Sequence, residues 1–172
     1  PSPTNSAQDI LGNAVRDRLN SLNLTGTGFA EVADSASINP TSAITIQCWI
    51  KSNTENDKGL VAKWKTGAQD YMLYKTSGSF SFYIGGTPLA GGAISNTGWV
   101  NIAGTYDGSS IKTFINGVQS ATSSLTGSIP NGVGPLEIGR YNQNSDKTYS
   151  ERIDDVKIYD RPLSAPEILQ NY

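Results

Sequence analysis

The sequence contains no histidine, and this absence excludes several kinds of chemistry. The chain cannot build a histidine-based catalytic triad, a histidine-ligated zinc site or a histidine general base from its own residues. It has one cysteine, Cys48, which therefore has no partner for a disulfide within the chain. Apolar neighbours predict that Cys48 is a small residue of the core. The low cysteine content is compatible with a secreted bacterial protein, a virion protein or a cytosolic protein.

A basic block and a long apolar run are also missing. Thirteen Lys and Arg against 15 Asp and Glu give a formal net charge of −2, and the basic residues are scattered along the chain. We therefore expect no nucleic-acid partner. No stretch approaches the roughly 20 apolar residues of a membrane span. No signal peptide is recognisable.

The residues that are abundant predict an all-β protein. Of 172 residues, 18 are Gly, 37% are apolar and 16% are charged, which is typical of one turn-rich domain with a single core. About ten to twelve strand-like runs, with turns about every eight to twelve residues, indicate a β-sandwich or barrel. Residues 1–19 are weakly patterned and are predicted to be an N-terminal arm or linker. The domain is expected over residues 20–172.

Two stretches carry the clearest strand patterns. In residues 43–51 apolar and polar side chains alternate, which predicts a strand with one buried face. Residues 98–119 contain two turn pairs, Asp107-Gly108 and Asn116-Gly117. Gly and Asn tolerate the positive φ that tight hairpins need, so this stretch predicts a three-stranded antiparallel meander. The expected inward residues of the first stretch are Ile44, Ile46, Cys48 and Ile50.

The end of the chain predicts one more strand and a short helix. Residues 152–159 form the last strand-like run. Ser164 then suits a helix N-cap, Pro166 is tolerated in the first turn, and Glu167 stands where a capping box needs an acidic residue.

Three paired stretches, taken together, carry a family resemblance. They are residues 22–34 with 42–51, residues 98–108 with 114–118, and residues 134–140 with the run Ile-Asp-Asp-Val-Lys-Ile-Tyr-Asp-Arg-Pro-Leu-Ser at 153–164. In order and spacing the chain resembles the LamG-like jelly-roll family of the concanavalin A-like lectin/glucanase superfamily. The resemblance implies an all-β jelly-roll β-sandwich of two antiparallel sheets with a short C-terminal helix. Such folds host lectins, carbohydrate-binding modules, glycosidases and structural modules, so any function drawn from it is an analogy.

Catalytic carboxylates do not follow from this resemblance. Glucanases of the superfamily carry a Glu-x-Asp-x-x-Glu strand, whose carboxyl groups act as nucleophile and acid/base. Glu31 and Asp34 do not match that motif, and Glu151, Asp154 and Asp155 belong to the region of the last strand. We therefore expect that the protein is not an enzyme.

Asp154 is the acidic residue with the most specific expectation. Alternation with Val156 and Ile158 predicts that Asp154 shares their inward face, where a carboxylate needs a partner. It is either a structural carboxylate, paired with backbone N–H groups or with Arg140 or Arg152, or a calcium ligand. The resemblance implies the second role, because family members often hold a structural Ca²⁺ between the first-strand region and the last strand.

Aromatic and amide side chains supply the candidate glycan site. The loop 141–150 combines planar amides with aromatic rings, which suit hydrogen bonding to and stacking on sugars; the alternative is an ordinary solvated loop. The same two interpretations apply to a second polar loop, which contains Asn53, Glu55, Asn56 and Asp57. Trp49 and Trp99 fall on the outer faces of their strands, either to pack under a crossing segment or to form a sugar platform, whereas Trp64 is expected in the core. The candidate ligand-binding residues are Tyr141, Asn142, Gln143, Asn144, Tyr149 and Trp99.

These observations lead to one functional hypothesis and one alternative. The hypothesis is a non-catalytic module that binds carbohydrate or a cell-surface glycoprotein, is extracellular or at the cell surface, and holds an optional structural calcium. The alternative is a structural or adhesive module of a surface filament or of a phage capsid or tail, which implies a virion location and contacts with other structural subunits.

Overall fold

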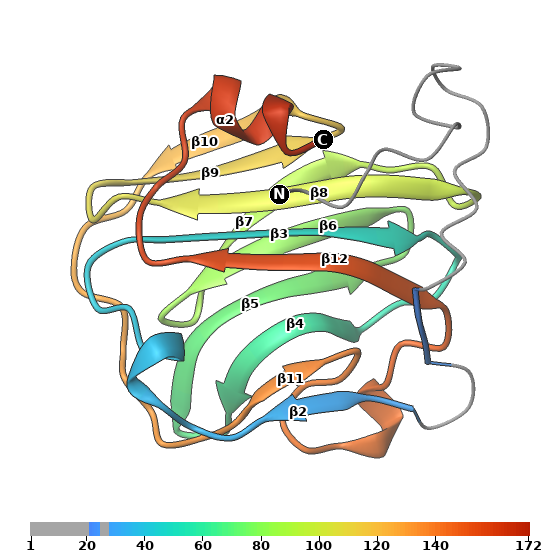
Figure 1. The fold of residues 1–172 in the computed structure, drawn as a ribbon, viewed down its shortest axis with the longest axis horizontal. Helices are drawn as coiled ribbons and strands as arrows, with labels where there is room; N and C mark the ends of the chain where they lie inside the picture. Colours follow the sequence, from blue (N-terminus) through green and yellow to red (C-terminus); the bar gives the residue numbers. More distant parts are fainter. Residues whose placement is uncertain (1–20, 25–27) are drawn as a thin grey trace, which may run out of the picture.

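The computed structural model describes residues 21–24 and 28–172, which form two stacked antiparallel sheets of six strands each (Figure 1). Sheet A has the order β1 (Leu22–Asn23), β12 (Arg152–Tyr159), β3 (Ile44–Lys51), β8 (Trp99–Tyr106), β9 (Ser110–Ile115) and β10 (Val118–Ser124). Sheet B has the order β2 (Ala30–Val32), β11 (Leu136–Ile138), β4 (Lys58–Lys65), β5 (Ala68–Thr76), β6 (Ser79–Ile84) and β7 (Thr87–Ala93). The helical segments are η1 (Ala36–Ile38), η2 (Ser145–Lys147) and α2 (Ala165–Gln170). The jelly-roll sandwich expected from the sequence is confirmed, whereas the expected arm at residues 1–19 lies outside the described residues.

The core lies between the sheets and follows from strand alternation. The inward residues expected for β3, including Cys48, are all fully buried. Burial raises the pKa of the Cys48 thiol well above its usual range, so this residue is an inert core hydrophobe, as predicted. Gly104 of β8 leaves the space into which the Phe82 ring of β6 packs, because a Cβ there would overlap that ring.

The meander over β8, β9 and β10 is also confirmed, and its turns are set by their sequences. Asn116 and Gly117 have φ of 50° and 79°, as a tight hairpin between β9 and β10 requires. At the other turn, the Asp107 carboxylate accepts hydrogen bonds from the backbone N–H groups and hydroxyls of Ser109 and Ser110. These bonds lower the pKa of Asp107.

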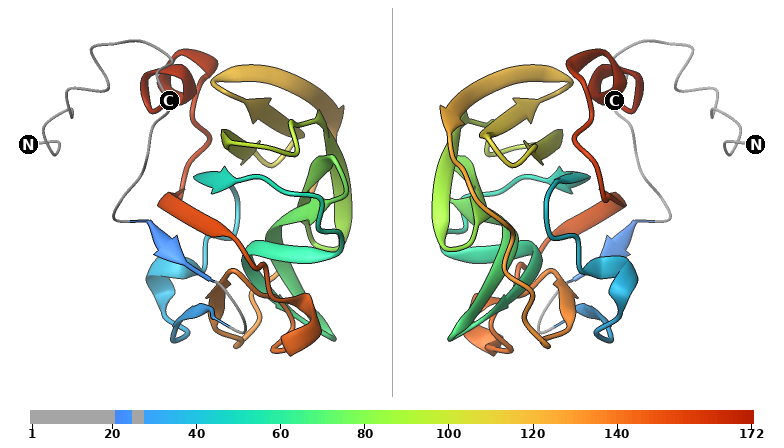
Figure 2. Two further views of the ribbon diagram at one scale, coloured as in Figure 1. Left: turned by 90° about the vertical axis from the view of Figure 1, so that its right-hand side faces the viewer. Right: turned by 90° about the vertical axis from the view of Figure 1, so that its left-hand side faces the viewer.

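The C-terminal helix covers the outer face of sheet A, on the side away from sheet B (Figure 2). The capping box between Ser164 and Glu167 is present, as predicted. Ile168 of α2 is fully buried in a small second core beside sheet A. Tyr172 stacks on the indole of Trp49 with ring centroids 5.2 Å apart, and Trp49 is only 4% exposed. Two roles were possible for an outward Trp49, packing under a crossing segment or forming a sugar platform. The structure shows the packing role.

A β-bulge in β12 overturns the predicted orientation of Asp154. Asp154 pairs with Trp49, whereas Lys157 pairs with Gln47, so β12 has one more residue than β3 between these pairs. Asp155, with φ of 50°, lies in this bulge. The extra residue reverses the alternation: Ile153 is fully buried in the core, and Asp154 lies on the outer face with Trp49. The prediction that Asp154 shares the inward face of Val156 was wrong for this reason.

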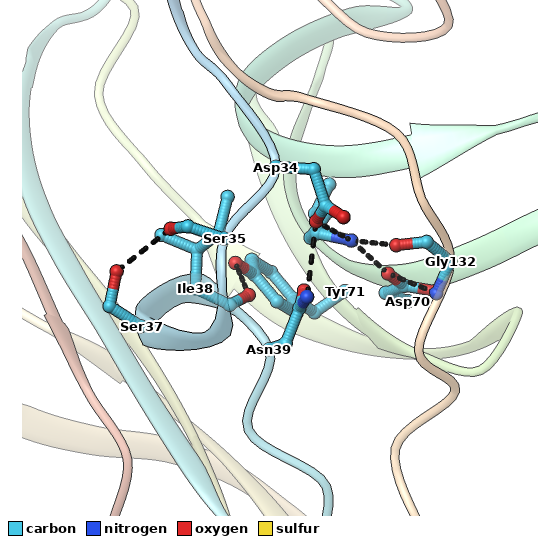
Figure 3. A network of polar contacts seen from close by, with 9 residues as sticks. Asp34, Ser35, Ser37, Ile38, Asn39, Asp70, Tyr71 and Gly132 are labelled. Atoms are coloured by element: carbon cyan, nitrogen blue, oxygen red, sulfur yellow. Dashed lines mark hydrogen bonds and ion pairs between the residues drawn. The ribbon is translucent and has the colours of Figure 1, made fainter.

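A buried ion pair joins sheet B to two loops (Figure 3). The ammonium of Lys63, a residue only 1% exposed, lies 2.9 Å from the carboxylate of Asp70, which is 2% exposed, and 3.2 Å from that of Asp34. Lys63 also donates to the carbonyl oxygen of Gly132, whose N–H donates to Asp70. Because β4, β5 and both loops meet here, the pair fixes the positions of four segments that are distant in the sequence.

Replacing one partner of this pair is expected to destabilise the fold strongly. Lys63→Met leaves the Asp70 carboxylate buried without its cation, which typically costs about 3–5 kcal/mol. Urea unfolding followed by tryptophan fluorescence measures the loss. The matched control is the double variant Lys63→Met/Asp70→Asn, in which no fully buried charge is left unpaired, because the remaining Asp34 carboxylate is 32% exposed. Its loss of stability is expected to be smaller. Equal destabilisation of the two variants would contradict the role assigned to the ion pair.

Candidate functional site

A row of aromatic rings lies on the outer face of sheet B. It consists of Trp64 of β4, Tyr83 of β6, Tyr74 of β5 and Tyr141 of the loop after β11, and we call it the aromatic row. Successive ring centroids are 5.2, 5.7 and 5.8 Å apart, and each pair meets edge to face. All four side chains are half-buried. They therefore keep part of each ring available to solvent while being held in fixed orientations.

The outward direction of these rings follows from register. Leu73 and Phe82 pair across β5 and β6 and are fully buried in the core, so their chain neighbours Tyr74 and Tyr83 lie on the opposite face. Met72 of β5 pairs with Tyr83 on that same outer face and is only 3% exposed. The row thus rests on a packed sheet and not on a flexible loop.

Trp64 was expected in the core, and this prediction was wrong. In β4 both Leu60 and Val61 belong to the core, because a bulge between Gly59 and Val61 shifts the alternation by one residue. Lys63 then points inward to Asp70, and Trp64 lies on the outer face.

The loop after β11 reaches the row because Gly59 has no side chain. A Cβ at Gly59 would lie 2.5 Å from the carbonyl carbon of Arg140 and 2.7 Å from the backbone nitrogen of Tyr141. The loop backbone is held there by bonds from Gly139 N–H to the Leu60 carbonyl, 2.8 Å, and from Asn142 N–H to the Trp64 carbonyl, 3.1 Å. This close approach places the Tyr141 ring beside Tyr74.

Asp57 is the polar centre of the site. Its carboxylate accepts hydrogen bonds from the hydroxyls of Tyr74, 2.8 Å, and Tyr141, 2.6 Å, and from the ammonium of Lys147. The ammonium also lies 5.9 Å from the centroid of the Tyr141 ring. Asp57 has φ of 59°, a left-handed conformation that Asp and Asn adopt more readily than most other residues with a side chain.

These contacts fix the charge states of the site. Burial and the hydrogen bonds to Asp57 raise the pKa values of Tyr74 and Tyr141, so both hydroxyls stay protonated and donate. Burial also raises the pKa of Asp57, but the hydrogen bonds from Lys147, Tyr141 and Tyr74 outweigh it and lower that pKa overall. At neutral pH Asp57 is therefore an anion held by a cation and two neutral donors.

The loop that carries Asp57 is anchored by two further residues. The carboxylate of Glu55 accepts from the N–H of Ser150 at 3.0 Å and from its hydroxyl at 2.8 Å. Lys75 is fully buried and donates from its ammonium to the carbonyl oxygens of Asn53, 3.1 Å, and Thr76, 2.6 Å. Burial lowers the pKa of Lys75. The two residues hold the Asp57 loop and the loop after β11 in one arrangement.

The structure separates the predicted ligand-binding residues into groups. Tyr141 belongs to the aromatic row, and Gln143 is exposed in the same loop while its N–H donates to Glu137. The Asn142 side-chain oxygen accepts from the N–H of Thr66, 2.8 Å, and that of Asn144 caps η2, so both amides hold the loop in shape.

Tyr149 and Trp99 do not join this surface. Tyr149 is fully buried, and its hydroxyl donates to the carbonyl oxygen of Lys51 at 2.5 Å, so its predicted contact with a ligand is wrong for this conformation. Trp99 lies in β8 of the other sheet, opposite Lys51, on the side away from the buried Val100. It cannot act together with Tyr141.

Sequence reasoning missed Tyr74 and Tyr83. A signal was present for the two tyrosines, because they stand out of phase with the inward residues Leu73 and Phe82. For Asp57 the sequence indicated a second polar candidate loop but not its contacts, because its partners come from three different segments.

Calcium at Asp154 stays a prediction. Within residues 21–24 and 28–172 no group of three or more His, Cys, Asp or Glu side chains is placed to hold a metal ion. The Asp154 carboxylate accepts from the N–H of Asp155 at 2.8 Å, a bond that belongs to the bulge.

Two stacked antiparallel sheets of six strands are the architecture of a concanavalin A-like jelly roll. Residues 24–169 match the Laminin_G_3 family model of the concanavalin A-like lectin/glucanases superfamily, and the chain belongs to this family. A comparison with curated proteins finds no match. In the described part of the chain no helix has the length and apolar character that crossing a membrane would require.

Solved structures share the fold at low identity. The binding domain of Paraclostridial Mosquitocidal Protein 1 is 21% identical with a TM-score of 0.69; the match covers 87% of this chain, which spans only 42% of that one. The CBM40 of Ruminococcus gnavus IT-sialidase, bound to alpha2,3 sialyllactose, is 18% identical with a TM-score of 0.69, covering 87% of this chain and 95% of that chain. Domain 4 of the Geobacillus stearothermophilus arabinanase AbnA, in complex with arabinotriose, is 14% identical with a TM-score of 0.68, covering 88% and 75%.

Gly59→Ala is expected to displace Tyr141 from the row. The added Cβ overlaps the Arg140 backbone, and such overpacking typically costs about 1–3 kcal/mol. Thermal unfolding measures the loss, and the tyrosine ring signals in NMR spectra report the displaced ring. Gly134→Ala is the matched control, because the nearest atom to a Cβ there is the Lys65 Cβ at 3.9 Å. Unchanged stability and spectra for Gly59→Ala would contradict the close approach.

Acid is expected to loosen the two loops through Glu55. Burial raises the pKa of this carboxyl, but hydrogen bonds from Asn53 and Ser150 outweigh it and lower the pKa below its usual range. Because the pKa of Glu55 is lower in the folded state, the stabilisation by its ionised carboxylate is complete above the unfolded-state pKa of about 4.3. It is lost as the pH falls through the folded-state pKa. As the pH falls below about 4.3 and passes through the lowered folded-state pKa, the wild type should lose more stability than Glu55→Gln, measured by urea unfolding. Parallel pH curves from urea unfolding would rule this role out.

Proposed function

We propose that this protein is a non-catalytic carbohydrate-binding module that holds a glycan against the aromatic row. The observation that carries the proposal is the row itself: four rings fixed on a rigid sheet and partly open to solvent. Sugar rings have apolar C–H faces that pack on aromatic rings, while their hydroxyls need hydrogen-bonding groups nearby. Asp57, Lys147 and the exposed Gln143 supply such groups beside Tyr141.

The family and the solved structures support a binding role. The fold is that of lectin-like and carbohydrate-binding modules, although some of its relatives are domains of enzymes. Two of the similar structures are described as bound to a sugar, sialyllactose in one and arabinotriose in the other. At their low identities this likeness concerns the fold, and the site proposed for this chain rests on its own residues.

A non-enzymatic role fits the carboxylates around the row. Glu137 of β11, between β2 and β4 in sheet B, is only 1% exposed and forms an ion pair with Arg140 at 2.6 Å. Asp57 is held as an anion by three donors, so neither group is arranged as the proton donor that glycoside hydrolysis needs. We further propose an extracellular or cell-surface location, and a structural calcium at Asp154 remains part of the proposal.

Trp64→Ala tests the site directly. Removing the largest ring of the row should weaken binding to the preferred glycan at least tenfold, since loss of an aromatic anchor at a binding site typically costs more than about 1.4 kcal/mol. Isothermal titration against soluble arabinan, xylan and galactan identifies the ligand and measures the loss. The matched control is Trp99→Ala, which removes the same side chain from the other sheet and should leave the affinity within about twofold. A loss with Trp99→Ala and none with Trp64→Ala would move the site to sheet A.

A further inference from the structure

The cationic side chains around the aromatic row already bind groups within the molecule, carboxylates in the case of Lys147 and Arg140 and a backbone carbonyl in the case of Lys58. Lys147 pairs with Asp57, and Lys58 donates from its ammonium to the carbonyl oxygen of Asp146 at 2.8 Å. Arg140 pairs with Glu137 at 2.6 Å, and its guanidinium carbon lies 3.4 Å from the centroid of the Phe29 ring. Lys65 directly follows Trp64 in β4, so strand alternation directs its side chain away from the face that carries the aromatic row.

A ligand on the row would therefore meet a negative charge first. The Asp57 side chain is 39% exposed, against 28% for its partner Lys147. Both tyrosine hydroxyls donate to the same carboxylate, which fixes it beside the rings of Tyr74 and Tyr141. A carboxylate or sulfate group on a sugar held by these rings would come close to Asp57, the more exposed member of the pair, and would find the Lys147 ammonium already bound to Asp57. Like charges a few ångströms apart disfavour binding, and salt screens this effect.

We propose that Asp57 is a specificity-determining residue that makes the aromatic row select uncharged glycans and reject glycans with carboxylate or sulfate groups. The inference rests on the proposed function, because it concerns the ligand class of the same site. It assigns Asp57 a role beyond holding two tyrosines, since a neutral amide oxygen could also accept from both hydroxyls. The pairing of Asp57 with Lys147 is what removes a positive charge from the site.

Asp57→Asn separates the two roles. The amide has the same shape and its oxygen can still accept from Tyr74 and Tyr141, but it carries no charge. The substitution removes the repelling anion and leaves the Lys147 ammonium without its counter-charge. The ratio of affinities for acidic and neutral glycans should therefore rise on the order of tenfold, and the gained binding should weaken as NaCl increases from about 50 to 500 mM.

The experiment compares glycans that share a backbone and differ in charge. Titration calorimetry is run with xylan against glucuronoxylan and with lactose against α2,3-sialyllactose, on the wild type, Asp57→Asn, Lys147→Met and the double variant. Thermal unfolding of each variant establishes that it is folded. The wild type should bind the acidic member of each pair at least about tenfold more weakly than the neutral member. Lys147→Met should keep this rejection because Asp57 remains, and the double variant should gain less acidic binding than Asp57→Asn.

The outcomes separate this inference from the proposed function. Equal or tighter binding of the acidic member by the wild type would overturn the inference while leaving glycan binding intact. This test uses the wild type alone, so it does not depend on the folding of any variant. A folded Asp57→Asn variant that binds a neutral glycan with an unchanged acidic-to-neutral ratio would overturn it as well. Absence of binding to neutral and acidic glycans alike, in the wild type, would overturn the proposed function together with the inference.

Discussion

Each strand of a two-layer sandwich can give only one of its faces to the core, and the rest of this structure depends on that constraint. In β3 and β8 the alternation is unbroken, so aliphatic side chains fill the interior and the outward face is left to polar residues and tryptophan. Where a bulge adds a residue, every following side chain changes face. The bulges in β4 and β12 turn Trp64 and Asp154 outward, and the first of them creates one end of the aromatic row.

The outer faces of the two sheets differ in how far other segments cover them. On sheet A, α2 contributes Ile168 to a second small core on the strands, and the Tyr172 ring covers Trp49. On sheet B, the loop after β11 crosses only β4, at Gly59, and leaves the rings of Tyr74 and Tyr83 half-exposed. The difference explains how one sandwich can have an outward tryptophan that packs and an outward tryptophan that remains available to a ligand.

Charged side chains stabilise two regions of sheet B, one inside the molecule and one on its surface. Inside, Lys63 and Asp70 pair where neither could be buried alone. On the surface, Asp57 gathers two hydroxyls and an ammonium from β5 and from the loop after β11. Each carboxylate joins segments that are remote in the chain, and the surface one also sets the electrostatic character of the aromatic row. Stability and ligand choice are thus governed by the same kind of contact in two different dielectric environments.

The sequence by itself determined the fold class, the strands with regular alternation, the hairpins at Asp107 and Asn116 and the capped C-terminal helix, because each depends on local periodicity or turn chemistry. It also indicated the loop that carries Tyr141. Only the tertiary structure decided which side chains share a surface: a bulge has no reliable local signal, so Trp64 and Asp154 were assigned to the wrong face, and Tyr149 could not be recognised as buried. Asp57 acquires its role from Tyr74, Tyr141 and Lys147, which lie 17 to 90 residues away along the chain. Contacts at such separations are set by how the sheets and loops pack together, which no local pattern records.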